Sequence, residues 1–344
     1  MDRRKIKIDE VSSGRPDMSL IREFIKPLPR YELGIPPWSK EELKKAYFSD
    51  FIYTRESIKK HPGYLAHSSL QDIALSLGIF CDSVSNLLES VQTFRSESHS
   101  GKFWTRPVRS RLDELELRVR RGVFASATSA MALVDCSRII SHHFTIPEYQ
   151  EKINAYFGNN YEHQFIQCLR NYVCHCRMIK ANWHISWPNK VRCCQFLLKK
   201  NELLLYKKWG QLSKKYIKNH PDGIDVETLF HDYRMRVEEF HQWFHDQIVK
   251  VSEPPLSEYR RYEQMLNQFS VRSEYNILLR TVIDRKLDPY TYLDDFLTEA
   301  EKEKILKLPM RSPEQVDKII EILDEYQACD AEIKEMTYKA FAVH

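Results

Sequence analysis

The side chains best suited to chemistry in this sequence stand in one short segment, Arg170-Asn171-Tyr172-Val173-Cys174-His175. Cleavage of an RNA phosphodiester without a metal requires a group that moves protons at the 2′-hydroxyl or at the leaving 5′-oxygen. It also requires a fixed cation beside the phosphate while negative charge develops there. Histidine and arginine are suited to these two roles. The segment therefore supplies both residue types that such a reaction needs.

Helical spacing decides which of these side chains can meet. Apolar residues recur at helical steps from about Tyr161 to Cys176, which predicts an amphipathic helix with the segment near its end. On an ideal helix Asn171 and His175 share one flank, at the border between the apolar stripe and solvent. Arg170 lies about 140° around the axis from His175. It must use its long side chain, or a distorted helix end, to meet the histidine.

Within a helical bundle, Arg170, Asn171 and His175 resemble the Arg-Asn-x-x-x-His motif of the HEPN superfamily. In that motif an Arg, often followed by a polar residue, precedes a His by four to six positions, and this chain matches the four-residue version. The stretch from Tyr161 to Tyr172 also looks like a group of uncharacterised bacterial proteins with a Leu-Arg-Asn-Tyr-x-x-His segment. The similarity covers about residues 70–250.

The resemblance implies a helical bundle that pairs with a second copy, so that two motifs face one cleft. In active members it implies a metal-independent endoribonuclease that leaves a 2′,3′-cyclic phosphate. On that analogy His175 is the acid and base, Arg170 the phosphate clamp and Asn171 an orienting group, in a bacterial stress or defence setting. Some toxin-type members carry a Tyr two residues beyond the His, where this chain has Arg177, and many members bind RNA or protein without cutting.

Two other interpretations of the segment stay open. In the first, Arg170 and Asn171 cap or brace the bundle, and His175 is a hydrogen-bonded boundary histidine. In the second, the chain is a non-enzymatic interaction module, in which the basic core binds a partner and the acidic C-terminal unit regulates it or docks a protein partner. An exposed, basic cleft that holds Arg170 and His175 would favour the nuclease, whereas a His175 buried beneath neighbouring elements would favour the module.

A phosphate-binding surface is predicted from four arginines, three before the motif in the sequence and one just after it. Cationic contacts supply most of the sequence-independent affinity for nucleic acids. Glu114 and Glu116 stand four positions before two of these arginines, so ion pairs along a helix face are the favoured explanation for that pair. The predicted RNA-binding residues are Arg118, Arg120, Arg121 and Arg177.

The composition predicts a mainly α fold, a helical bundle with an inserted β-hairpin and an additional C-terminal helical unit. Only 9 of 344 residues are Gly, hydrophobic residues make up 42% and charged residues 29%, and helix-forming Leu, Glu and Lys are frequent. Periodic apolar residues predict helices at about 70–94, 106–140, 161–176, 200–218 and 225–251. In the second of these, Phe124 is expected to face inward, and Gly122 is small enough to let another helix approach closely.

A β-hairpin is predicted at about residues 178–198, where the apolar period changes from helical steps to two. Trp183 and Trp187 alternate with polar residues, so both are expected on the buried face, and stacking on unpaired RNA bases is the alternative. The segment Pro188-Asn189-Lys190 is the expected turn.

Charge and turn residues divide the chain into three predicted parts. Residues 1–66 form an N-terminal arm with short helices, residues 67–251 the HEPN-like core, and residues 252–344 an acidic helical unit. Of 52 Lys+Arg and 48 Asp+Glu in the whole chain, the last part holds 13 and 19, so its net charge is −6 and that of residues 1–251 is +10. An anionic partner such as RNA is expected on the basic part.

No cofactor, metal or membrane span is expected. The Cys-x-Cys and Cys-Cys spacings around the hairpin are not paired zinc knuckles, and His241 and His245 are expected on a packed or solvated helix face. The least charged stretch, from Val123 to Val134, is shorter than the roughly 20 residues of a spanning helix. The charged N-terminus and the cysteine usage predict a cytoplasmic, reduced protein. The resemblance implies that it works as a homodimer.

Overall fold

The computed structural model describes residues 29–158, 160–176, 178–179, 183–187 and 192–343. The fold is mainly α, with one small antiparallel sheet, and this confirms the predicted fold class. The longer elements of the central part are α4 (Gly63–Glu97), α5 (Arg109–Ser141), α7 (Tyr161–His175), α10 (Val226–Ser252), β1 (Trp183–Ser186), β2 (Cys193–Leu198) and β3 (Ile224–Asp225). Shorter helices there are α6 (Tyr149–Ile153), α8 (Lys200–Leu204) and α9 (Gln211–Lys218). The remaining helices are α2 (Lys40–Ser49), α3 (Phe51–Ile58), α11 (Pro255–Arg285), α12 (Leu293–Phe296), α13 (Glu299–Leu306), α14 (Pro313–Leu323) and α15 (Ala331–Phe341).

Residue contacts group the chain into two compact units, which we call the central unit (residues 62–259) and the terminal unit (residues 1–61 and 260–344). The terminal unit thus combines the two ends of the chain. The predicted three-part division, with boundaries at 66 and 251, stays a prediction.

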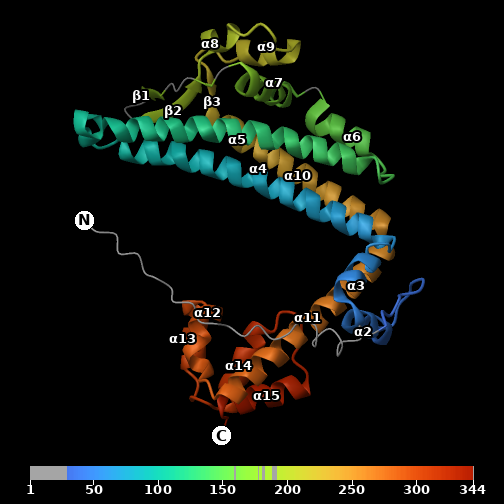
Figure 1. The fold of residues 1–344 in the computed structure, drawn as a ribbon. Helices are drawn as coiled ribbons and strands as arrows, with labels where there is room; N and C mark the ends of the chain where they lie inside the picture. Colours follow the sequence, from blue (N-terminus) through green and yellow to red (C-terminus); the bar gives the residue numbers. More distant parts are fainter. Residues whose placement is uncertain (1–28, 159, 177, 180–182, 188–191, 344) are drawn as a thin grey trace, which may run out of the picture. The chain divides into compact units, whose positions relative to one another are not determined.

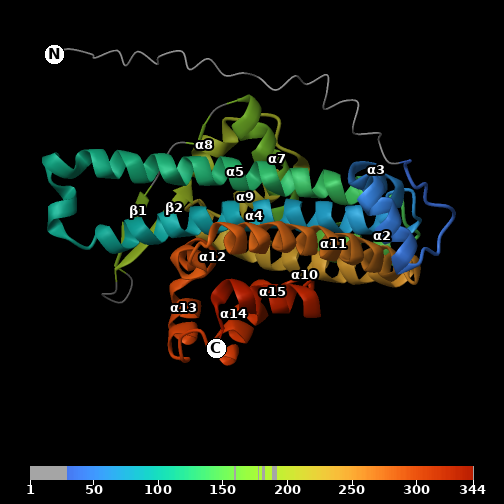
Figure 2. The same ribbon diagram turned by 60° about the horizontal axis from the view of Figure 1, so that its bottom comes forward.

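Helices α4 and α5 lie side by side along most of their length in both views, and α10 packs along α4 (Figure 1 and Figure 2). The close approach occurs at Gly122, because a Cβ there would lie only 2.9 Å from the Leu87 Cβ. The prediction for this glycine is therefore confirmed. Phe124, however, is 37% exposed, so the expectation that it faces inward is wrong. It stands two positions beyond Gly122, and two residues turn a helix by about 200°, onto the opposite face.

The hairpin forms where the period of two predicted it. Strands β1 and β2 pair antiparallel with Trp183 opposite Phe196, and β3 continues the sheet by pairing with β2. Trp183 stacks on the buried Phe94 of α4, with ring centroids 3.4 Å apart, which confirms its buried side. Trp187 is 63% exposed, so its predicted burial is wrong: it lies one residue past the end of β1, where the alternation no longer holds. The expected turn, residues 188–190, lies outside the described residues.

One predicted helix, at 200–218, is in fact two. Helix α8 ends at Leu204 and α9 begins at Gln211. Between them the buried Trp209 donates its indole N–H to the Leu203 carbonyl (2.6 Å), which satisfies a carbonyl at the end of α8. Gly210 then takes an extended conformation at the N-cap of α9.

Helix α5 is, within the described residues, the one helix long and apolar enough to cross a membrane. Its residues Val119, Val123 and Ala127 are fully buried in the core of the central unit. Packing against α4 and α7 thus accounts for its apolar character, since a helix that is apolar on several faces is typical of a core position.

The terminal unit is built on α11, which the sequence patterns did not predict. Helices α2 and α3 contact its first half: Phe48 of α2 lies beside Phe269, and the Arg55 Nη2 of α3 donates to the Asn267 Oδ1 (3.1 Å). Just before α2, the Trp38 backbone N–H donates to the Tyr262 hydroxyl (2.9 Å). Helices α12 to α15 form a separate apolar cluster around Leu293, Val316 and Phe341. A 3-10 turn begins after Asp288 and α14 after Ser312, and in both cases the cap side chain accepts a backbone N–H and a Pro occupies the first position.

Candidate functional site

Helix α7 positions the motif by burying one face in the central unit. Its N-cap Asn160 accepts the His163 backbone N–H through its side chain (2.9 Å) and so fixes where the helix begins. Phe165 and Leu169 are fully buried in the main core, and α7 packs against α9 and α5. The opposite face remains for solvent, and it carries the polar residues of the motif.

The three predicted catalytic residues stand at the C-terminal end of α7, where two of them interact. The Arg170 Nη1 donates to the Asn171 Oδ1 at 3.0 Å. Asn171 and His175 are exposed, and Arg170 is half-buried. In the described part of the chain no contact joins Arg170 to His175, in agreement with their separation around the helix. One protomer therefore holds a cation and an exposed histidine near each other in sequence without bringing them together.

Arg170 keeps an unused donor. Its buried Nε has no hydrogen-bond acceptor among the atoms that the structure describes, although a buried guanidinium nitrogen normally has one. A nitrogen this buried is not accessible to an RNA phosphate, so a phosphate contact by Arg170 has to come from its Nη atoms, of which Nη1 also donates to Asn171.

A small cavity of about 160 Å³ lies beside the motif helix, between the end of α7 and the segment around α8. Tyr172 and Cys176 line it from the α7 side, and Glu202 and Tyr206 line it from the other. Glu202 and Tyr206 did not stand out in the sequence, because they follow the motif by about 30 residues and share no spacing with it. Only the packing of α8 beyond the hairpin brings them there.

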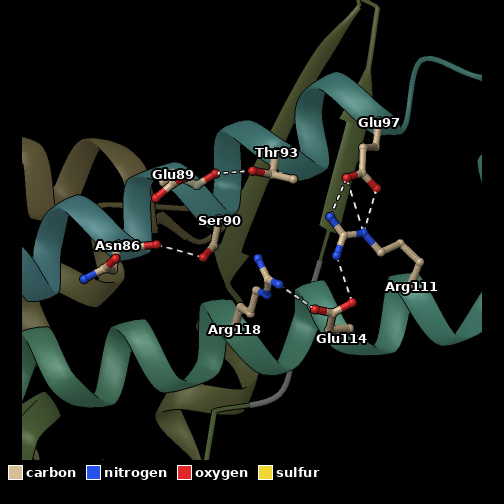
Figure 3. A network of polar contacts seen from close by, with 8 residues as sticks. All are labelled: Asn86, Glu89, Ser90, Thr93, Glu97, Arg111, Glu114 and Arg118. Carbon is tan, nitrogen blue, oxygen red and sulfur yellow. Dashed lines mark hydrogen bonds and ion pairs between the residues drawn. The ribbon is translucent and has the colours of Figure 1, made fainter. Parts of the chain in front are cut away.

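Ion pairs occupy two of the predicted RNA-binding arginines. Arg118 pairs with Glu114 (2.6 Å) and Arg120 with Glu116 (3.3 Å). Figure 3 shows Arg118 within a larger network, in which Arg111 of α5 also joins Glu114 to Glu97 of α4. The favoured explanation by helix-face ion pairs is confirmed. Hydrogen bonding from Arg111 also holds the pKa of the Glu97 carboxyl below its ordinary value.

Arg121 differs from these two arginines. It is exposed, and the structure records no ion pair for it within the described residues. Together with Arg118 it lines a cavity of about 320 Å³ between α4 and α5. Thr128, seven residues later and therefore on the same face of α5, touches Cys174 of α7 (3.7 Å between Oγ1 and Sγ). Arg121 thus lies about 10 Å along α5 from that contact with the motif helix. Arg177 lies outside the described residues.

The histidine pair on α10 is structural. The His241 ring contacts the Ser137 hydroxyl (3.0 Å) and the Val237 carbonyl (2.8 Å), and its burial lowers its pKa to about 4. His245 instead contacts Asp246. The prediction of a packed or solvated helix face is confirmed for both. Among the described residues no group of three or more His, Cys, Asp or Glu side chains could hold a metal ion.

Fold and site together define a mainly α protein with an exposed Arg-Asn-x-x-x-His segment at a helix end. Comparison with protein-family models, with curated proteins and with solved structures found no match.

Proposed function

We propose that this chain is a HEPN-like, cytoplasmic protein that binds RNA and cleaves it without a metal, as a homodimer in bacterial stress or defence. The observation that carries the proposal is the exposed position of His175 at the end of α7. A histidine packed under the hairpin could not reach a phosphodiester. Asn171 shares the exposed flank and holds the Arg170 guanidinium at 3.0 Å.

In the proposed reaction the RNA 2′-oxygen forms a bond to phosphorus while the bond from phosphorus to the 5′-oxygen breaks. His175 accepts the proton of the 2′-hydroxyl or donates one to the leaving 5′-oxygen. Arg170 donates through its Nη atoms to the phosphate oxygens as their charge rises. The products are a 2′,3′-cyclic phosphate and a 5′-hydroxyl.

A second copy of the chain can supply the residue that one helix cannot bring to the same phosphate. Arg170 and His175 point away from each other around α7, so one protomer does not direct both at the same phosphate. Two motifs that face one cleft allow the arginine of one protomer to work with the histidine of its partner. Arg121, without an ion pair in the described part of the chain, is the upstream arginine best able to add a phosphate contact.

The test is incubation of the purified chain with mixed RNA in EDTA, with analysis of the product ends. We expect cleavage with cyclic phosphate ends, and a loss of at least about 100-fold in rate for His175→Ala and for Arg170→Ala. His143→Ala, an exposed histidine outside the motif, and Arg138→Ala, an exposed arginine of α5 paired with Asp135, are the controls and should cut like the parent chain. Intact RNA, or cutting that all variants share, would refute the nuclease.

A non-enzymatic interaction module is the second candidate, and a specific feature favours it: an apolar cavity of about 480 Å³ in the terminal unit. Salt-dependent retention of RNA on a filter separates the two candidates when no cutting occurs. Retention that weakens steeply with salt and with Arg121→Ala would keep the RNA-binding half of the proposal. If the filter retains no RNA, the interaction module is the remaining candidate.

A further inference from the structure

The apolar cavity of the terminal unit is a pocket of about 480 Å³, a size at which proteins hold small ligands or a few side chains of a partner. Helix α11 forms one wall through Leu278 and Val282, α12 contributes Phe296, and α14 contributes Ile319. Leu278 is 48% exposed and Phe296 is 59% exposed, so large apolar side chains stand open at its mouth. Exposed apolar surface of this kind around a cavity is typical of a docking site.

Most polar groups deeper in the wall have partners within the chain. The Tyr275 hydroxyl donates to the Leu323 carbonyl (2.7 Å), and the hydroxyls of Thr281 and Thr337 each donate to a carbonyl of their own helix. The Asp324 carboxylate accepts two backbone N–H groups at Ala328 and Cys329. These groups therefore need no hydrogen bond from a ligand, and the pocket is suited to apolar side chains.

One carboxylate at the edge remains available. Asp295 lines the pocket and is exposed, and within the described residues it has no ion pair, whereas its neighbour Asp294 pairs with Lys302. The surrounding residues 252–344 carry a net charge of −6. An occupant with an apolar stripe and basic residues beside it would match both features.

The chain contains such a segment in residues 18–26, Met-Ser-Leu-Ile-Arg-Glu-Phe-Ile-Lys, which lie outside the described residues. Met18, Ile21 and Ile25 follow each other at steps of three and four, and Phe24 stands three positions after Ile21. This is the spacing of anchors for an amphipathic helix in a groove. At the same spacing, Arg22 and Lys26 fall together on one edge of the stripe.

The described chain begins close enough for this segment to reach the pocket. Near its start the Tyr31 backbone N–H donates to the Ser49 hydroxyl (3.0 Å) at the end of α2, whose Phe48 contacts Phe269 of α11. The first pocket residue of α11, Tyr275, follows Phe269 by six residues, about 9 Å along the helix axis and about 120° around it. The four residues between the segment and Tyr31 cover up to about 13 Å when extended, which is enough to bring the end of the segment to the pocket.

We propose that residues 18–26 of the same chain dock in the apolar pocket of the terminal unit, with Arg22 or Lys26 beside Asp295. The segment and the pocket belong to one chain, so the local concentration favours docking in cis over capture of a separate partner. Docking covers Leu278 and Phe296 and makes the N-terminal segment a built-in occupant of the pocket. A partner with the same stripe would then have to displace it.

Photo-crosslinking in the full chain tests this assignment. With p-benzoylphenylalanine in place of Phe24, irradiation at low protein concentration should yield cross-links within one chain, mapped by mass spectrometry to residues 275–341. Leu278→Glu should lower the yield about tenfold, because a carboxylate would face the apolar anchors. Ile277→Glu, at the neighbouring 66% exposed position that does not line the pocket, should leave it unchanged.

A charge exchange and a second pocket variant complete the test. Asp295→Lys should lower the yield, and Arg22→Glu with Lys26→Glu in the same chain should restore it. Phe296→Glu repeats the Leu278→Glu result at another exposed position, so a folding defect of one variant does not decide the outcome. Cross-links outside residues 275–341, equal yields in the Leu278 and Ile277 variants, or cross-links that join two chains would each overturn docking in cis.

Discussion

A fall in pH from 7 to 5 is expected to lower the unfolding free energy of the central unit by about 4 kcal/mol through two buried histidines. His163 contacts the Tyr233 hydroxyl (3.0 Å), and burial, followed by the nearby charges of Arg138 and Arg236, lowers its pKa to about 4. Burial also lowers the pKa of His241 to about 4. Both rings therefore stay neutral in the folded chain when the same residues take up protons in the unfolded chain.

Stability falls with pH because the unfolded chain binds more protons than the folded chain. Above a pH of about 6.5, the ordinary histidine pKa, neither state holds the extra protons and the two histidines do not affect stability. Below it the unfolded chain binds more protons, so stability falls until the folded-state pKa of about 4 is reached. At pH 5 each histidine contributes about 2 kcal/mol to the loss. Burial raises the pKa of Glu162, so protonation of that carboxyl partly opposes the loss.

Urea unfolding followed by tryptophan fluorescence measures this effect, because five of the six tryptophans lie in residues 62–259. His163→Gln and His241→Gln should each remove about half of the fall between pH 7 and 5, and the double variant nearly all of it. His231→Gln, at an exposed position of α10, should keep the whole fall. The same fall in the double variant and in the parent chain would show that the two rings are protonated in the folded state.

The strongly amphipathic helices of the central unit could be predicted from sequence, because one buried face repeats the helical period. Helix α7 was expected at about 161–176 and runs from Tyr161 to His175. Helix α11 escaped prediction for the opposite reason. Its apolar residues do not keep to one side, since Tyr262 is buried against Trp38 while Leu278 lines a pocket. The helix also begins at Pro255, within a Pro-Pro pair that the sequence marks as a break.

At the candidate site, only contacts between residues close in the sequence could be predicted. Adjacent residues gave the contact between Arg170 and Asn171, and four-residue spacing gave the ion pair of Arg118. No local pattern relates Glu202 to Cys176, although both line the small cavity beside α7. Contacts of this kind depend on how distant elements pack, which the period of a single segment does not encode.

Gly122→Val is expected to destabilise the central unit by about 3 kcal/mol, although valine has the better intrinsic helix propensity. A Cβ at this position would lie 2.9 Å from the Leu87 Cβ and 3.0 Å from the Leu87 Cα. Because the Cα belongs to the backbone of α4, a change of rotamer at Leu87 does not relieve the collision. The two helices must separate, and contacts are lost along a core whose members, such as Val84 and Val119, are fully buried.

Gly78→Ala is the matched control, since Gly78 also lies inside a long helix but nothing stands within 4 Å of the added Cβ. It should stabilise the chain by about 0.5–1 kcal/mol, because alanine loses less backbone entropy in a helix. Gly122→Ala should destabilise, so the same substitution is predicted to have opposite signs at the two positions. Urea midpoints by circular dichroism at constant pH give both values. Stabilisation by alanine at both glycines would mean that α4 and α5 do not approach each other this closely.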